Sequence, residues 1–119
     1  MENISYLEKQ DINDNGDLKP YVGKGKPVII MAQGNFCHYC TDAKPAFQEL
    51  NNKTNIIVVA TILVDGETPE KEAAKFLTKW DPNHRGVPAY FGFDKTGKFK
   101  SLHTGKRDLK SLEAFAKTL

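Results

Sequence analysis

The two cysteines of the chain, Cys37 and Cys40, are separated by two residues in the stretch GNFCHYCTDAKP. Cysteines at this spacing on a first helical turn have Cα atoms about 5 to 6 Å apart, within the range that a disulfide tolerates. A helix N-terminus also offers unpaired backbone N–H groups and a positive dipole end, which favour the thiolate over the thiol. The pattern therefore predicts a reactive dithiol in which exposed Cys37 attacks, a mixed disulfide forms, and buried Cys40 resolves it.

Two other uses of the cysteine pair are less well supported. A structural zinc site needs about four ligands, commonly from two such pairs. This chain has one pair, and its three histidines do not have the usual two-histidine spacing: His38, His84 and His103. A purely structural disulfide would close so short a loop that it would hardly constrain the unfolded chain. We therefore expect no metal and no bound cofactor, because the electrons reside in the disulfide of Cys37 and Cys40.

Length and composition are typical of a small globular protein. The 119 residues predict a single domain, and 39% hydrophobic with 27% charged residues is ordinary. A net charge of +2 gives no indication of a nucleic-acid partner, and the longest apolar run, Ile56–Val64, is too short to span a membrane. The polar N-terminus lacks the apolar stretch of a signal peptide, which favours the cytoplasm. A periplasmic or secreted chain whose signal peptide has been removed would look the same.

A strand and a helix must hold the cysteine pair, and the hydrophobic pattern predicts both. Pro27–Ala32 is a short apolar run that predicts a buried strand. A helix is expected to begin near Cys37 and to end at Asn51–Asn52, with Pro45 bending it. Its apolar face has helical spacing: Cys40, Ala43, Phe47 and Leu50. Asn55–Asp65 is apolar and β-branched, which predicts a central strand covered on both faces.

The rest of the chain predicts further elements around this unit. Ile4–Leu7 reads as a short edge strand, and Thr68 as the cap of a helix with Pro69 at its first position. That helix would direct four apolar residues to the core: Ala73, Phe76, Leu77 and Trp80. Two strands, Ala89–Phe93 and Lys98–Leu102, form a hairpin, and Asp108 caps a last helix. The order of these elements predicts an α/β fold, a mixed sheet with helices on both faces.

These features together resemble the thioredoxin family. The resemblance rests on the strand, the Cys-x-x-Cys helix with its internal Pro45, and the stretch RGVP, which ends at Pro88 just before a strand. It covers about Pro27 to Leu119, with Gly105 and the capped last helix matching the family's ending. It implies a thioredoxin fold over a single domain, residues 1–119, and thiol–disulfide oxidoreductase activity.

The resemblance also implies roles for particular residues. Cys37 and Cys40 would be the catalytic pair. The Val87–Pro88 peptide would be cis and lie against the disulfide, and Val87 would offer its backbone to an extended substrate segment.

Around the cysteines the chain departs from the Trp-Cys-Gly-Pro-Cys that is usual in thioredoxins. Phe36, Tyr39 and Gly34 are predicted to rim the surface that contacts the substrate. His38 has two open interpretations. When protonated it would stabilise the nearby thiolate and make the disulfide more oxidising, or it is a solvated loop residue with little effect.

A second departure concerns the residues beneath the cysteines. Met31 stands six residues before Cys37, where the family places a buried aspartate, and the lysine that commonly pairs with that aspartate falls on Thr61. The family's proton relay to the buried thiol is therefore absent.

The expected function is reduction of disulfides in protein substrates, with a reductase or another dithiol protein that recharges the cysteine pair. An oxidase or isomerase of the same fold in an oxidising compartment is an alternative. A non-catalytic binding module is a third, but a scaffold needs neither Cys37 nor Cys40. No nucleic acid or membrane partner is expected.

Overall fold

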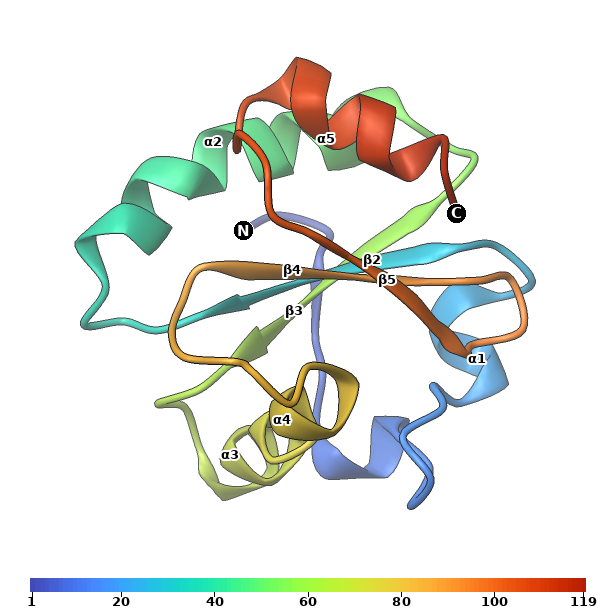
Figure 1. The fold of residues 1–119 in the computed structure, drawn as a ribbon, viewed down its shortest axis with the longest axis vertical. Helices are drawn as coiled ribbons and strands as arrows, with labels where there is room; N and C mark the ends of the chain where they lie inside the picture. The colour runs from blue at the N-terminus through green and yellow to red at the C-terminus, as the bar shows by residue number, and fades with distance from the viewer.

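A five-stranded mixed sheet runs through the middle of the computed structural model, which describes residues 1–119 (Figure 1). Its strands are β1 (Ser5–Tyr6), β2 (Val28–Gln33), β3 (Val58–Leu63), β4 (Ala89–Phe93) and β5 (Phe99–His103). They lie in the order β1-β3-β2-β4-β5. The strand β3 runs parallel to both β1 and β2, whereas β4 is antiparallel to both β2 and β5. The mixed sheet predicted from the order of elements is thus confirmed.

Helices cover both faces of the sheet, as predicted. Figure 1 shows α2 (His38–Lys53) and α5 (Leu109–Ala116) on one face, and α3 (Thr68–Ala74) and α4 (Leu77–Trp80) on the other. The N-terminal segment adds a 3-10 turn at Lys9–Asp11 and the short helix α1 (Pro20–Gly23), which the sequence pattern did not reveal. None of the helices is both long and apolar enough to span a membrane.

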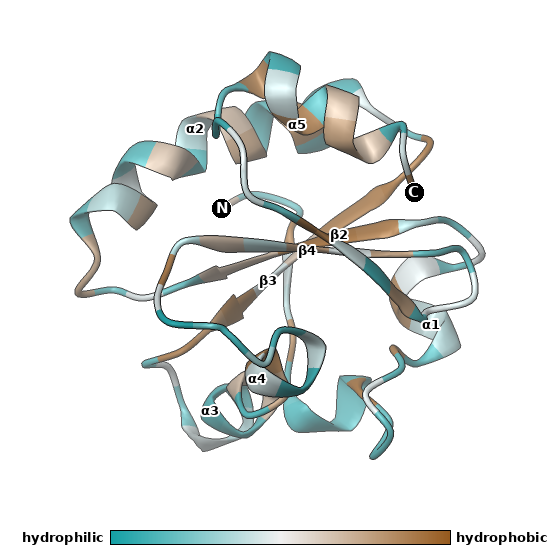
Figure 2. Ribbon diagram, in the orientation of Figure 1, coloured by the Kyte–Doolittle hydropathy of each residue, from teal (hydrophilic) through white to brown (hydrophobic).

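Strand β2 is buried on both faces, so its residues alternate between two apolar cores. Ile29 and Met31 pack into the core beneath α2 and α5, whereas Ile30 and Ala32 belong to the core beneath α3 and α4. Figure 2 shows the apolar strands between helices whose outer faces are hydrophilic. This double burial holds the end of β2, and the loop that follows it, in a fixed position.

Several boundaries differ from the sequence prediction because pairing decides them. The predicted strand Asn55–Asp65 is shorter, since its partner in β2 begins at Val28, which pairs with Val58. Helix α2 continues one residue beyond Asn51–Asn52, to Lys53.

The helix predicted to begin at Thr68 also differs in detail. Its N-cap is Glu67, which forms a capping box with Glu70, and Pro69 is in the first turn. The helix is interrupted after Ala74, and α4 restarts at Leu77. Of the predicted core residues on this segment, Ala73, Leu77 and Trp80 are buried and Phe76 is partly buried.

Candidate active site

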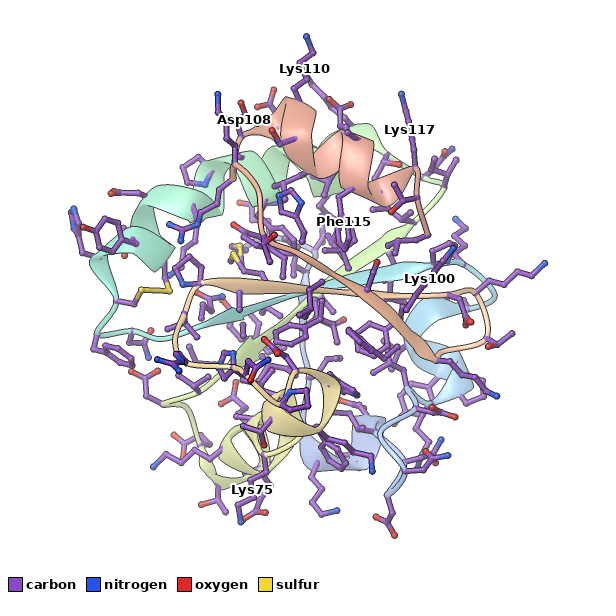
Figure 3. All side chains as sticks on the ribbon, in the orientation of Figure 1. Lys75, Lys100, Asp108, Lys110, Phe115 and Lys117 are labelled. Carbon is purple, nitrogen blue, oxygen red and sulfur yellow. A yellow bond between two sulfur atoms is a disulfide. The ribbon has the colours of Figure 1, made fainter.

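Helix α2 begins at the cysteine pair. Cys37 is the N-cap residue in an extended conformation, and its Sγ accepts a hydrogen bond from the backbone N–H of Cys40 at 3.0 Å. The two cysteines form a disulfide with Cα atoms 5.2 Å apart. Figure 3 shows this disulfide near the surface at the N-terminal end of α2. The predicted apolar face is buried against the sheet, and Pro45 lies inside the helix.

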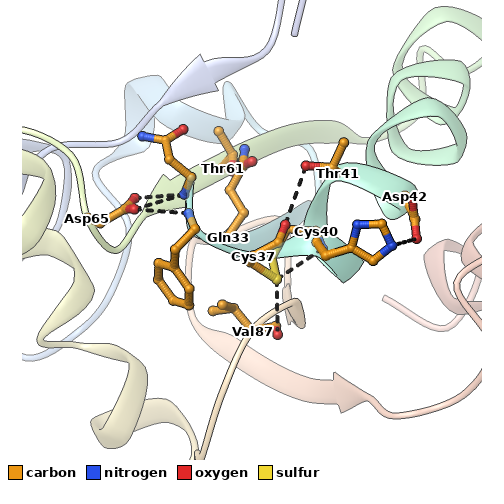
Figure 4. Close-up of a disulfide and its surroundings, with 11 residues drawn as sticks. Gln33, Cys37, Cys40, Thr41, Asp42, Thr61, Asp65 and Val87 are labelled. Carbon is orange, nitrogen blue, oxygen red and sulfur yellow. Dashed lines mark hydrogen bonds and ion pairs between the residues drawn. A yellow bond between two sulfur atoms is a disulfide. The ribbon is translucent and has the colours of Figure 1, made fainter.

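The two sulfur-bearing residues differ in their access to solvent. Cys37 is 8% exposed and Cys40 is fully buried. The prediction that Cys37 is exposed is therefore wrong. The carbonyl oxygen of Val87 lies 3.5 Å from Cys37 Sγ, so the loop before β4 covers part of the sulfur (Figure 4). Of the pair, Cys37 is the cysteine that a partner can reach from outside.

The fold brings Val87 and Pro88 to the disulfide from 50 residues away in the sequence. Both residues are partly buried, and the peptide bond between them is cis. Pro88 leads directly into β4, whose pairing with the central strand β2 fixes the position of this loop. A backbone carbonyl is thus presented beside the sulfur of Cys37.

Three side chains stand out around the cysteines. Phe36 is 74% exposed, Tyr39 is 67% exposed, and the side chain of His38 is 82% exposed. His38 Nε2 lies 3.3 Å from the Asp42 carboxylate, a partner that we did not predict although it lies four residues along the same helix. Gly34 does not belong to this rim, because it is buried, and a side-chain Cβ there would collide with the ring of Phe36.

Asp65 anchors the loop that leads into α2. Its carboxylate accepts the backbone N–H of Asn35, with 2.9 Å to each oxygen, and the N–H of Phe36 at 3.4 Å (Figure 4). Asp65 lies two residues after the end of β3, and 30 residues of sequence separate it from Asn35. The sequence analysis missed this contact. The available signal was an aspartate at the end of an apolar strand, at the same sheet edge as the cysteine loop.

Two polar side chains lie fully buried beneath the site. Gln33 Nε2 donates to Thr61 Oγ1 at 2.9 Å, and Thr61 Oγ1 donates to the carbonyl oxygen of Met31 at 2.7 Å. Met31 and Thr61 are register partners on β2 and β3. Because the side chain of Met31 is apolar and fully buried, no carboxylate occupies this position.

Tyr90 is a second buried polar residue on this side of the sheet. It pairs with Met31 across β2 and β4, is 3% exposed, and its hydroxyl has no hydrogen-bond partner. Burial raises the pKa of the Tyr90 hydroxyl to about 12, while the charge of Arg107 acts in the opposite direction. The hydroxyl therefore stays protonated at neutral pH.

The other two histidines do not join the site. The ring of His84 lies 6.0 Å from that of Phe91, and His103 Nε2 is 2.7 Å from the carbonyl oxygen of Lys106. No three His, Cys, Asp or Glu side chains come together in an arrangement suited to a metal ion.

Comparison with known proteins agrees with this geometry. The family model for a thioredoxin-like domain matches residues 15–118. A thioredoxin-like protein of Invertebrate iridescent virus 6 is 39% identical over 100 residues, covering 73% of this chain and 72% of the viral protein. The thiol-disulfide oxidoreductase YkuV of Bacillus subtilis (strain 168) is 29% identical over 126 aligned positions, covering 89% of this chain and 84% of YkuV.

Solved structures show the same fold. Thioredoxin F from spinach chloroplast superimposes with a TM-score of 0.69 at 18% identity, covering 97% of this chain and 91% of that protein. The family match spans most of the sequence, and the Cys37–Cys40 disulfide lies at the start of α2 within it. The chain therefore belongs to the family of thioredoxin-like domains.

Proposed function

We propose that this protein is a thiol–disulfide oxidoreductase that reduces disulfide bonds in protein substrates in the cytoplasm. One observation carries the proposal. Cys37 Sγ accepts the backbone N–H of Cys40 at the N-terminus of α2, and the backbone carbonyl of Val87 lies 3.5 Å from the same sulfur. The helix end stabilises a Cys37 thiolate, which is the nucleophile of disulfide exchange. The family membership and the YkuV relative support the same chemistry.

Reduction proceeds in two exchanges from the dithiol form. The Cys37 thiolate attacks one sulfur of the substrate disulfide. A Cys37–substrate disulfide forms, the substrate S–S bond breaks, and the leaving sulfur takes up a proton. Cys40 then loses its proton and attacks Cys37 Sγ, which forms the Cys37–Cys40 disulfide and releases the second substrate thiol. Two electrons pass from the cysteine pair to the substrate.

The surroundings of Cys37 suit an extended peptide segment. The backbone of Val87 beside cis Pro88 offers hydrogen-bonding groups that pair with an extended chain. Phe36, His38 and Tyr39 supply an exposed, largely aromatic rim that contacts the side chains of such a segment. Protein thiols and disulfides are therefore the proposed substrates, and a reductase or another dithiol protein returns the pair to its reduced form.

The reducing direction is supported by the pair formed by His38 and Asp42. A protonated imidazole between the two cysteines would favour the thiolate form and make the disulfide more oxidising. The Asp42 carboxylate, 3.3 Å from His38 Nε2, offsets that positive charge.

Two measurements test the proposal. The purified protein should accelerate reduction of insulin by dithiothreitol, and the Cys37→Ser variant should not. The redox potential against glutathione should lie near about −270 mV. A potential of about −120 to −180 mV would instead assign the protein as an oxidase or isomerase. Equal rates of insulin reduction with the wild type and with Cys37→Ser would instead support a non-catalytic binding module.

A further inference from the structure

The side chain of Gln33, the last residue of β2, is fully buried and satisfied at one end only. Its Nε2 donates to Thr61 Oγ1, and the Thr61 hydroxyl donates its single hydrogen to the carbonyl oxygen of Met31. Thr61 can therefore only accept from Gln33, which fixes the orientation of the amide. Gln33 Oε1 is left buried without any donor.

Sheet register places Gln33 close to the loop that faces the reactive pair. Ala32, the residue before Gln33, pairs with Ala89 in the antiparallel ladder, and Val87, two residues before Ala89, presents its carbonyl to Cys37 Sγ. Gln33 lies on the same face of β2 as Met31, the face that α2 covers with Cys40. Figure 4 draws the side chains of Gln33 and Thr61 among the surroundings of the disulfide.

A buried amide oxygen without a donor destabilises the state that contains it. In the oxidised protein neither sulfur carries a hydrogen, so the disulfide provides no hydrogen-bond donor to Gln33 Oε1. In the reduced protein, buried Cys40 carries an S–H group that can donate. We propose that Gln33 Oε1 accepts a hydrogen bond from the reduced Cys40 thiol and that Gln33 thereby sets the balance between the two redox forms.

The redox step determines in which direction this hydrogen bond shifts the equilibrium between disulfide and dithiol. Two glutathione thiols reduce the Cys37–Cys40 disulfide: the protein S–S bond breaks, glutathione disulfide forms, and two protons pass to the protein sulfurs. The proton on Cys40 makes the proposed bond, and oxidation removes it. Gln33 therefore stabilises the dithiol form, and its loss should make the protein a stronger reductant. This inference rests on the proposed function only in requiring that the pair can be reduced and oxidised.

The first test measures the equilibrium between the protein and glutathione. Replacing Gln33 by leucine removes the acceptor, and the equilibrium should shift three- to tenfold toward the protein disulfide, where tenfold equals about 30 mV. Met31→Leu is the matched control, because Met31 is also fully buried on the same face of β2 but offers no acceptor. Its equilibrium should stay within twofold of wild type. An unchanged Gln33→Leu equilibrium, or a shift toward the dithiol, would overturn the proposal.

A second test needs no substitution of Gln33. In the Cys37→Ser variant the buried Cys40 thiol is the only S–H group, because the chain has two cysteines. Its Raman S–H stretching band should lie at a lower frequency than that of a thiol without a hydrogen bond. A band at the unbonded frequency would refute the contact even if Gln33→Leu does not fold. If the band is shifted but the wild type fails to reduce insulin, the proposed function is wrong and this inference stands.

Discussion

Both oxygens of the Asp65 carboxylate lie 2.9 Å from the backbone nitrogen of Asn35, two residues before Cys37. This contact joins the turn after β3 to the loop that delivers the nucleophile. Because hydrogen bonds to a carboxylate are stronger than neutral ones, Asp65→Ala should lower the free energy of unfolding by about 1 to 2 kcal/mol. It should also slow insulin reduction severalfold, since the loop no longer holds Cys37 in place.

Urea denaturation and the insulin assay measure these two effects. Asp65→Asn is the matched control, because its amide keeps one acceptor oxygen and should lie between wild type and Asp65→Ala in both measurements. Wild-type stability and rate in Asp65→Ala would show that the contact does not hold the loop.

Cys37 should react with alkylating agents much faster than Cys40. Cys37 is partly accessible at a helix N-terminus, whereas Cys40 is fully buried. We expect iodoacetamide below pH 8 to label Cys37 first in the reduced protein, as measured by mass spectrometry of the peptides. The Cys40→Ser variant should accumulate mixed disulfides with substrates, because it cannot resolve them. Equal labelling of both cysteines would contradict the assignment of roles.

Placing a carboxylate at Met31 should speed the resolving step and weaken the fold. Cys40 must lose its proton while buried, and burial in apolar surroundings disfavours that loss. An aspartate at position 31 would provide a base on the sheet face beneath α2. It would lie unpaired, since Thr61 carries no positive charge and already donates to the Met31 carbonyl, so we expect a loss of about 1 to 3 kcal/mol in stability.

Rapid-mixing kinetics on a defined mixed disulfide measure the resolving rate in Met31→Asp. Met31→Asn is the control, because it buries a polar side chain of similar size that cannot act as a base. If folded Met31→Asp resolves no faster than Met31→Asn, proton removal from Cys40 does not limit the step.

Tyr90→Phe should raise the free energy of unfolding at neutral pH and make that free energy depend less on pH in the alkaline range. The substitution removes a buried hydroxyl that has no partner, which should add about 1 kcal/mol at neutral pH. The folded-state pKa of about 12 lies above the unfolded value of 10.0, so the folded form holds its proton more tightly. The wild-type free energy of unfolding therefore does not depend on this group below pH 10. It falls as the pH rises from 10 toward 12, by up to about 1.4 kcal/mol per pH unit, and Tyr90→Phe should lack this fall.

Urea denaturation between pH 7 and pH 12 tests this difference. Tyr39→Phe, at an exposed position, is the control and should follow the wild type. Parallel alkaline curves for wild type and Tyr90→Phe would mean that Tyr90 does not contribute to the pH dependence.

Features that repeat with a helical or strand period were predictable from the sequence. The spacing of Cys40 and Phe47 identifies the buried face of α2, and the cysteine pair marks where that helix begins. These signals are local, because the apolar residues that mark the buried face of a helix recur at helical spacing within one continuous segment of the sequence. The alternation of apolar and turn-forming segments likewise predicted the order of the elements and hence a mixed sheet.

The contacts that support the disulfide could not be read in the same way. Thr61 is one β-branched residue in an apolar run, and Gln33 stands at a strand end, so neither suggests a buried hydrogen bond. Only the register of β2 against β3 brings them together. Asp65 and Asn35 meet for the same reason, across 30 residues of sequence. Strand ends depended on pairing too, which is why β3 is shorter than its apolar run.

The two-residue strand β1 covers the edge of β3, which bears on the association of one copy of the protein with another. Ser5 and Tyr6 pair with Ala60 and Thr61, and the N–H of Leu7 donates to the Thr61 carbonyl at 2.8 Å. Residues 15–118, which match the family model, contain both cysteines but not this strand. A chain trimmed to that match would expose the outer edge of β3, whose sequence VVATIL has strong β propensity and no charge. Such an edge joins readily to another sheet, so we expect residues 4–7 to protect the domain against aggregation.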